Sequence, residues 1–379
     1  MDNMHRLPPF KIPAACGTCG ILDRTGARFS GADVVRGMAN MHERGNGLGA
    51  GYVAYGIYPD HADDYCLHLM CAGTAGLDRA RDYLGSVMTI VHDEPIPTRP
   101  TATITDEPVL WRCFVQPPEG KRDSGRALQS PTGSASGEAS HTAAEADFMV
   151  ACIMTLNRDV EGAYVASSGK NMGIFKGVGY PEPIADFYLI PEYQGYLWVS
   201  HTRFPTNTGG WWGGAHPFGL LEWSIVHNGE LSSYGVNKRY VKSFGYECTL
   251  MTDSEVISYM LDLLCRKHKL SIEMAALAMA APEWDEIDEE PDAERKALLT
   301  AMRQTYSGAL LNGPFGVIAG HNGGMFGMSD RLKLRPLAAA TTGNRAYIAS
   351  EEAAIWAVDG KPDQAWPIDA GTPVRFDLL

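Results

Sequence analysis

The order of strand-like and helical segments is the feature that most constrains the fold of this chain. Short β-rich runs that end in turns occur before residue 75, between residues 162 and 229, and in the tail, 315–379. Helical patterns lie among these runs, at 77–88, 148–160 and 253–269. Strand runs at both ends with helices between them favour an α+β fold, in which sheets are covered by helices.

Two segments predict element boundaries as well as element types. A short strand is expected from Cys16 to Ile21, and the segment 253–269 is an amphipathic helical pattern with Asp253 at its expected start. After Ser30, apolar side chains recur at helical spacing, which predicts a helix with one apolar face formed by Val34, Val35, Met38 and Met41.

Length and composition exclude several classes of protein. The chain has 379 residues, enough for a core that needs no disulfide or metal staple. Its net charge of −13 argues against a nucleic-acid partner, because phosphate binding requires a basic face. No run approaches the length of a membrane span, and the N-terminal segment lacks the apolar core of a secretion signal. The eight scattered cysteines are expected to be free thiols of a cytoplasmic protein.

Two segments are expected to lie outside the folded part of a single domain, 16–379. Residues 1–15 are polar and Pro-rich and are interpreted as a leader. Residues 117–147 are rich in Ser, Gly, Ala and Pro and contain no aromatic residue, which predicts an exposed, disordered insert.

The stretch CGTCG places Cys16 and Cys19 in a C-x-x-C spacing that is compatible with three kinds of chemistry. A structural zinc site needs four Cys or His ligands, usually in two close pairs, and no second C-x-x-C is present. A thioredoxin-like redox pair would stand between a strand and a helix, whereas this stretch reads as the start of a strand. The third alternative is one nucleophilic cysteine beside a bystander. It is preferred over metal and redox roles, and no metal site is predicted.

A cysteine that begins a mature chain carries its own base. The thiolate is the attacking species, and an α-amine with a pKa of about 7.7–8.0 can take the thiol proton. The same amine can return the proton to a leaving group, so no histidine is required. For Cys16 this chemistry requires that the bond between Ala15 and Cys16 be cut, which would make residues 1–15 a propeptide.

Several motifs together resemble class II glutamine amidotransferases, which are N-terminal-nucleophile (Ntn) hydrolases. In this order they are similar to the stand-alone amidotransferase subunit of archaeal-type glutamate synthases. The resemblance implies an Ntn-hydrolase fold, a four-layer αββα sandwich of two antiparallel sheets covered by helices. The motifs are CGTCG (16–20), HERGNGLGAG (42–51), SSGKNMGIFKGVGYPE (167–182), HTRFPTNTGGWWGGAHPF (201–218), HNGELSSYG (227–235), TDSEV (252–256) and DRLKLRPL (330–337).

The resemblance favours Cys16 over Cys19 as the nucleophile. Gly17 and Gly20 stand at the family's offsets from Cys16, although Thr18 departs from the pattern, which has Ile or Val at that position. Cys19 is the alternative because Gly and Ile follow it, but Asp23 then occupies a position where the family has Gly. Cys19 is expected to be a small buried residue on the same strand.

The resemblance also implies an oxyanion site at Asn228 and Gly229. An amide nitrogen leaves through a tetrahedral oxyanion, which needs preorganised N–H donors. In the family these are the Asn side chain and the Gly backbone N–H of a His-Asn-Gly motif. Asn-Gly is also the commonest sequence of a type I′ hairpin turn, and both descriptions can hold at once.

Three further residues correspond to positions that bind glutamine in the family. Arg203 would grip the α-carboxylate, a task suited to a bidentate guanidinium, and Thr206 could add a hydroxyl or N–H. Asp253 would pair with the α-ammonium, and a helix N-cap is its structural alternative. Arg44 is expected to support the nucleophile structurally. The motif histidines at 42, 201, 216 and 227 are assigned to packing or hydrogen bonding.

The chain has no iron–sulfur cysteine cluster and no convincing flavin or nucleotide motif, so no cofactor is expected in it. By resemblance, FMN and an iron–sulfur cluster are expected on a glutamate-synthase-type partner that receives the ammonia, in a hetero-oligomer. The alternatives are a related synthase that makes an N-substituted glutamate, a non-catalytic regulatory homologue, and an Ntn hydrolase acting on another amide.

Overall fold

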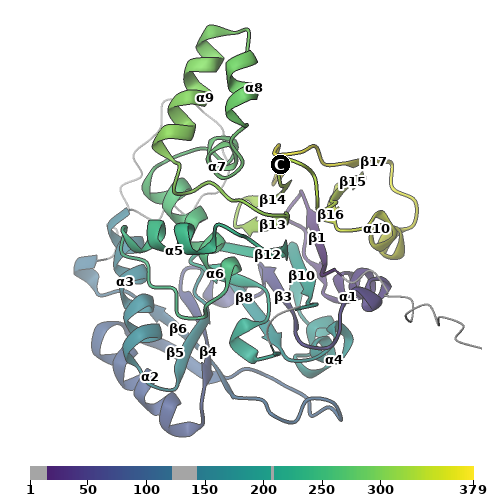
Figure 1. Ribbon diagram of the computed structural model, residues 1–379. Coiled ribbons are helices and arrows are strands. Elements are labelled where there is room, and N and C mark those ends of the chain that lie inside the picture. The colour runs from purple at the N-terminus through teal and green to yellow at the C-terminus, as the bar shows by residue number, and fades with distance from the viewer. Residues whose placement is uncertain (1–14, 122–142, 206–208) are drawn as a thin grey trace, which may run out of the picture.

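The computed structural model describes residues 15–121, 143–205 and 209–379, and two antiparallel sheets form its centre (Figure 1). The seven-stranded sheet has the order β17 (Gln364–Pro367), β15 (Ala338–Thr342), β16 (Arg345–Ala349), β1 (Gly17–Asp23), β10 (Leu197–Thr202), β3 (Ala50–Tyr55) and β8 (Met172–Gly177). The five-stranded sheet has the order β11 (Phe218–Leu220), β12 (Trp223–Gly229), β13 (Phe315–His321), β14 (Gly324–Ser329) and β18 (Val374–Asp377).

Alternation along β1 shows how the two sheets meet. Cys19 and Ile21 belong to the apolar cluster on the helical side of the seven-stranded sheet, whereas Leu22 belongs to the cluster between the sheets. Gly20 also faces the second sheet, where a Cβ would lie 3.0 Å from the Met325 sulfur. The layer between the sheets is closed by buried aliphatic side chains, among them Val53, Val199, Val226, Ile318 and Ile348.

Helices cover both outer faces of this pair of sheets. On the seven-stranded sheet lie α1 (Ala32–Asn40), α4 (Pro181–Phe187) and α10 (Glu352–Asp359) (Figure 1). On the other sheet, α6 (Asp253–Leu261) packs on β11 and β12, next to α5 (Tyr234–Lys242) and α7 (Ile272–Met279). The predicted four-layer αββα sandwich is therefore confirmed.

A smaller sheet lies beside the sandwich, in the order β5 (Thr89–Pro95), β6 (Val109–Gln116), β4 (Tyr65–Cys71) and β7 (Ala163–Ser167). It is covered by α2 (Thr74–Val87) and α3 (Ala143–Asp159) (Figure 1). We call it the accessory sheet. A two-stranded pair, β2 (Phe29–Ser30) and β9 (Gln194–Gly195), completes the strands of the described residues.

The prediction of a disordered insert at 117–147 is wrong at both ends of that segment. Residues Glu119–Lys121 form a short 3-10 turn, and α3 begins at Ala143. The helix extends this far because the alanine-rich run before 148 has high helix propensity and buries Ala146 in the core. Residues 122–142, like the expected leader up to residue 14, lie outside the described residues.

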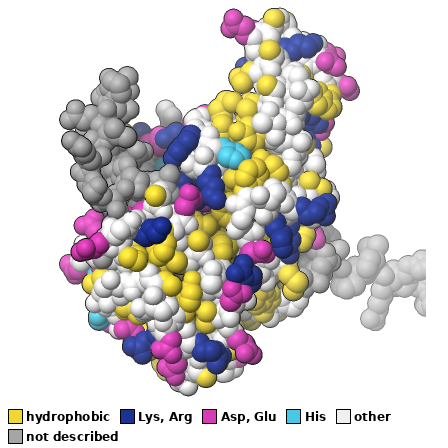
Figure 2. Space-filling view, turned by 90° about the vertical axis from the view of Figure 1, so that its left-hand side faces the viewer, with side chains coloured by type: hydrophobic (Ala, Val, Ile, Leu, Met, Phe, Trp, Pro, Cys, Tyr) yellow, Lys and Arg dark blue, Asp and Glu magenta, His cyan; other side chains and the backbone are white. Residues whose placement is uncertain are grey.

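The hairpin of α8 (Trp284–Glu289) and α9 (Ala293–Thr305) projects from the body of the molecule (Figures 1 and 2). On the face that Figure 2 shows, lysines and arginines are interspersed with acidic side chains and form no continuous basic patch. Within the described ranges, no helix combines the length and apolar character needed to cross a membrane.

Candidate active site

Three strand ends bring the predicted site residues together at one end of the sandwich. Cys16 directly precedes β1, and Arg203 directly follows β10. Because Gly17 pairs with Thr202 across these antiparallel strands, Cys16 and Arg203 leave the sheet side by side. Asn228 lies near the end of β12, which with β13 is one of the strands of the second sheet that contact both β1 and β10.

The Cys16 thiol is half-buried and accepts a hydrogen bond from the backbone N–H of Phe204, with N and Sγ 3.3 Å apart. Burial raises the pKa of the Cys16 thiol above its usual value. The Phe204 N–H and the positive charges of Arg203 and Arg335 act against this rise, since each stabilises the thiolate. These three groups therefore offset part of the effect of burial on the reactive thiolate form.

The backbone around Cys16 is fixed by segments from both ends of the chain. Arg44 donates from Nε to the Cys16 carbonyl oxygen at 3.2 Å and forms an ion pair with Glu351. The Thr18 backbone N–H donates to the Ser350 hydroxyl at 3.1 Å, and the Ser350 backbone N–H donates to the Thr18 carbonyl oxygen at 2.9 Å. Arg44 thus contacts the backbone of the cysteine and not its sulfur. The sequence analysis did not identify Ser350 or Glu351.

Cys19 is fully buried and packs against α1, where a Cβ on Gly37 would lie 3.2 Å from its sulfur. Burial raises the pKa of its thiol to about 12. The expectation that it is a small interior residue is confirmed. All eight cysteines are free, as expected.

Asn228 and Gly229 do not form the hairpin turn that their sequence could encode. Both lie in β12 and pair with Gly316 and Phe315 of β13, so the turn interpretation is wrong. Gly229 has φ +152°, and a Cβ there would lie 2.0 Å from the Pro314 oxygen, so this position requires glycine. Asn228 is 1% exposed, and its Nδ2 has no hydrogen-bond partner among the residues that the structure describes.

Asp253 is the first residue of α6, but it is not the N-cap. Thr252 is the N-cap, because its hydroxyl accepts from the Glu255 N–H. The Asp253 carboxylate instead accepts from the Leu231 N–H at 2.9 Å and from the Ser254 hydroxyl at 3.2 Å. Burial opposes the charged form, but His227 and these donors hold the pKa of Asp253 below its usual value.

Three of the four motif histidines, His201, His216 and His227, form a buried network behind Asp253, in agreement with their assignment to packing and hydrogen bonding. His42 lies apart from them, half-buried, and hydrogen-bonds Glu182 at 3.0 Å. His216 Nε2 and His227 Nδ1 lie 2.7 Å and 3.1 Å from the Ser254 hydroxyl. His201 stacks on His216 with ring centroids 4.0 Å apart and donates to the His227 carbonyl oxygen at 3.0 Å. Burial lowers the pKa of His201 to about 3, so its ring is neutral at physiological pH.

Arg203 is held by the glycine-rich loop before β3. Its N–H donates to the Gly49 oxygen at 2.8 Å, and its carbonyl accepts from the Asn46 N–H at 3.2 Å. Burial lowers the pKa of Arg203, while Cys16 and Asp253 act in the opposite direction. Its charge therefore interacts with both the thiol and the carboxylate. Thr206 lies outside the described residues.

Two cations near the site were missed by the sequence analysis, which quoted their motifs without assigning them. Arg335 comes from DRLKLRPL, and Lys176 comes from β8. Lys176 is fully buried, donates from Nζ to the Gly213 oxygen at 3.0 Å and lies 4.2 Å from the centre of the Phe218 ring. It therefore supports the loop that holds the paired tryptophans, of which Trp212 is buried and Trp211 is exposed.

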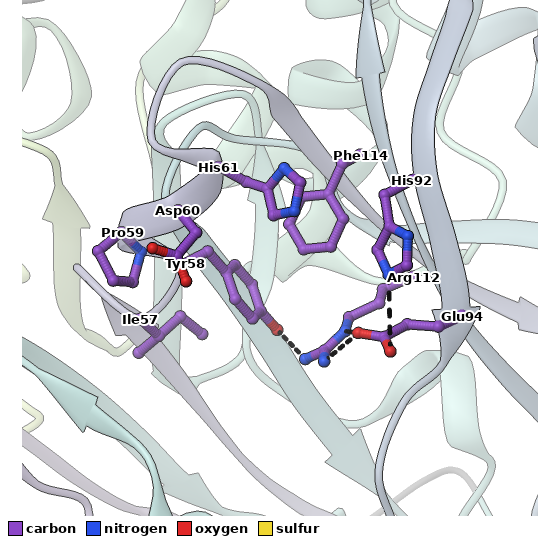
Figure 3. A pocket seen from close by; sticks show the side chains of 9 residues that line it. All are labelled: Ile57, Tyr58, Pro59, Asp60, His61, His92, Glu94, Arg112 and Phe114. Atoms are coloured by element: carbon purple, nitrogen blue, oxygen red, sulfur yellow. Dashed lines mark hydrogen bonds and ion pairs between the residues drawn. The ribbon is translucent and has the colours of Figure 1, made fainter.

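A separate cavity of about 240 Å³ lies at the accessory sheet, and Cys16 is not among its lining residues. Figure 3 shows the Arg112 guanidinium between the Tyr58 hydroxyl and the Glu94 carboxylate, with His61 stacked on Phe114. In the part of the chain that the structure describes, no three His, Cys, Asp or Glu side chains come together so that they could hold a metal ion.

Comparison with known proteins gives one matching family. The sequence profile of class II glutamine amidotransferases matches residues 148–364, a span that contains Arg203, Asn228, Gly229 and Asp253 and begins after Cys16.

Relatives of this chain differ in how much of it they cover. An uncharacterized protein of Archaeoglobus fulgidus is 44% identical over 369 residues, which are 97% of this chain and 93% of that protein. A glutamine–fructose-6-phosphate aminotransferase of Pseudomonas syringae is 32% identical over 173 residues, 44% of this chain and 27% of that enzyme. Glutamine phosphoribosylpyrophosphate amidotransferase from B. subtilis is a structural neighbour with a TM-score of 0.42 and 13% identity, over 96% of this chain and 49% of that one.

Proposed function

The chain belongs to the class II glutamine amidotransferases, and from this premise we propose that it releases ammonia from glutamine through a thioester on Cys16. One observation carries the proposal: the ends of β1, β10 and β12 gather Cys16, Arg203 and Asn228 at one end of the sandwich. The charge of Arg203 also interacts with Asp253, the proposed partner of the substrate ammonium.

In the proposed first step, the Cys16 thiolate attacks the side-chain carbonyl carbon of glutamine. The carbonyl oxygen becomes an oxyanion, which Asn228 Nδ2 and the Gly229 N–H stabilise as donors. The buried amide nitrogen of Asn228, which has no partner within the described chain, supports this role because the oxyanion would supply its missing acceptor. The carbon–nitrogen bond then breaks, and ammonia leaves with a proton from the α-amine of Cys16.

In the second step, water attacks the γ-glutamyl thioester. The α-amine accepts a proton from the water and passes it to the leaving sulfur as the carbon–sulfur bond breaks, which releases glutamate and restores the free thiol. Arg203 and Asp253 hold the α-carboxylate and α-ammonium of the substrate in both steps, with Thr206 as a further carboxylate ligand. These contacts select free glutamine over a glutamine residue within a peptide, which lacks both charges.

The amine mechanism requires that residues 1–15 be removed, so we propose that they are a propeptide. Mass spectrometry of the purified active protein tests this point. A chain that begins at Cys16 is expected. Full activity in a sample that keeps the residues before Cys16 would contradict the amine as base.

We further propose that the ammonia passes to a partner subunit of the glutamate-synthase type, which would carry FMN and an iron–sulfur cluster. The free thiols of this chain favour a reducing compartment such as the cytoplasm for this hetero-oligomer. Purification of the tagged chain from its own organism, followed by absorption spectra of the associated subunit, tests the partner. A partner without flavin would favour a different ammonia acceptor.

Glutamate release from glutamine is the test of the activity itself. Wild-type protein should release glutamate, and Cys16→Ala should release none. A folded wild-type protein that is inactive even with its partner would favour a regulatory homologue. Preference for an amide other than glutamine would favour a different hydrolase.

A further inference from the structure

The loop between β14 and β15, residues 330–337, is tied to the strand that pairs with the oxyanion segment. Asp330 is 4% exposed, and its carboxylate organises the loop by accepting backbone N–H groups. One donor is the backbone N–H of Phe315, at 3.2 Å. Phe315 pairs with Gly229 in the neighbouring strand. The others lie in the loop itself, and they are Leu332 at 3.0 Å, Leu334 at 3.0 Å and Arg335 at 3.3 Å. The backbone of Arg335 is therefore fixed relative to the site.

The side chain of Arg335 begins next to the partner of Asn228. A Cβ on Gly316 would lie 3.4 Å from the Arg335 Cβ, and Gly316 is the residue that pairs with Asn228. The Arg335 side chain therefore starts within van der Waals reach of the residue that pairs with Asn228.

The guanidinium of Arg335 has an unusual environment for a structural arginine. Its Nε is buried and has no hydrogen-bond partner within the described ranges. An unsatisfied buried donor destabilises the folded state, and more so when the group is charged. Arg331, four residues earlier, differs: it donates to Asn312 at 2.7 Å and pairs with Glu283 at 3.1 Å.

We propose that Arg335 is a positioning residue that acts through Cys16, as a second cation beside Arg203 that stabilises the thiolate. The two arginines then divide the work. Arg203 is engaged by the substrate carboxylate, whereas Arg335 keeps its charge available to the sulfur throughout the cycle. The direction in which Arg335 shifts the pKa of Cys16, downward, agrees with this role. The benefit of a stabilised thiolate rests on the proposed function, whereas the experiment that tests the effect of Arg335 on Cys16 does not require glutaminase activity.

The test measures how fast iodoacetamide alkylates Cys16 as a function of pH, with peptide mapping to separate Cys16 from the other cysteines. Alkylation reports thiolate and needs no turnover of glutamine. In Arg335→Met and Arg335→Gln the midpoint should move to higher pH by about 0.5–1 unit, because a nearby positive charge is lost. Arg335→Lys keeps the positive charge, so its midpoint should lie close to that of the wild type. The matched control Arg331→Met should leave the midpoint unchanged.

A purely structural role for Arg335 predicts a different result. It would lower the melting temperature in Arg335→Met without moving the alkylation midpoint. An unmoved midpoint in whichever neutral variant remains folded, by circular dichroism, would overturn the proposal. Absence of glutaminase activity in the wild type would reject the proposed function and leave this measurement interpretable.

Discussion

The end of the sandwich at Cys16 and the cavity at the accessory sheet contain similar side chains but use them differently. Both combine arginine, carboxylate, histidine and aromatic groups. At the cavity these groups satisfy one another: Arg112 donates from Nε to the Glu94 carboxylate at 2.8 Å (Figure 3). The Tyr58 hydroxyl, which also lines the cavity, lies 2.8 Å from His68 Nε2. At Cys16, buried donors of Asn228 and Arg335 have no partner in the described part of the chain.

This difference separates a structural polar cluster from a site built for a ligand. Native proteins satisfy nearly all buried polar groups, since each unsatisfied one costs free energy. Donors that stay unsatisfied next to a nucleophile are explained if a substrate or oxyanion completes them. Under the proposed function, catalysis belongs to the end of the sandwich at Cys16 and stability to the cavity, and the predictions below test that assignment.

The largest expected effect separates the two cysteines of CGTCG. Cys16→Ala should abolish glutamate release, because no other described group at the site can carry the thioester. Cys19→Ala should keep activity and lose about 1 kcal/mol of folding free energy, as is typical of a small cavity in the core. Glutaminase assays and urea titrations of both variants measure this. Activity that survives Cys16→Ala and disappears with Cys19→Ala would reverse the assignment.

The next effect concerns the oxyanion donors. Asn228→Ala should lower kcat by about 10²–10³-fold, the cost of removing one such donor. The melting temperature should change little, since Nδ2 makes no bond within the described chain that the substitution would break. Steady-state kinetics and thermal unfolding of the same sample provide both numbers. A large loss of stability with normal kcat would make Asn228 structural.

The cavity should respond in the opposite way. Arg112→Met leaves the Glu94 carboxylate without its guanidinium partner and should cost about 1–2 kcal/mol of stability, because Glu94 is 37% exposed and solvent screens the pair. The kcat/KM for glutamine should stay at the wild-type value. Should activity fall while stability holds, the cavity would belong to the functional machinery.

The smallest effect comes from Lys176, whose pKa burial lowers to about 7. Between that value and the ordinary lysine pKa near 10.5, the unfolded chain binds a proton that the folded protein lacks. The free energy of unfolding should therefore rise with pH in this window, by about 1 kcal/mol for each pH unit. Lys176→Met should remove this slope. Urea unfolding of both proteins at about pH 8 and about pH 9 measures the difference, and equal slopes would contradict a buried neutral lysine.

The parts of the fold that the sequence predicted depend on local patterns. The strand expected from Cys16 to Ile21 is β1, Gly17–Asp23. The apolar face predicted after Ser30 is correct for Val34, Met38 and Met41, which are buried, whereas Val35 is half-buried. The layered fold followed from the order of elements and from the resemblance. The helix expected at 253–269 begins at Asp253, but regular α-helix ends at Leu261 and continues as a π-helical turn.

Apart from the early start of α3, which has a local signal in its alanine-rich run, the errors and omissions at the site involve long-range contacts. Asn-Gly has the composition of a turn, and only its pairing with the distant strand β13 makes it part of β12. Thr18 and Ser350 are separated by 332 residues, and Arg44 and Glu351 by 307. The role of Arg335 depends in the same way on which strand its loop contacts. No local pattern could reveal these neighbours.

The measurement that tests the central claim most directly is to trap the covalent intermediate. Wild-type protein would be mixed with glutamine, quenched in acid during turnover, digested and analysed by mass spectrometry. The account predicts a γ-glutamyl thioester on the peptide that contains Cys16, and none in the Cys16→Ala variant. A glutamyl adduct on any other cysteine, or steady turnover with no adduct together with full activity of Cys16→Ala, would contradict it.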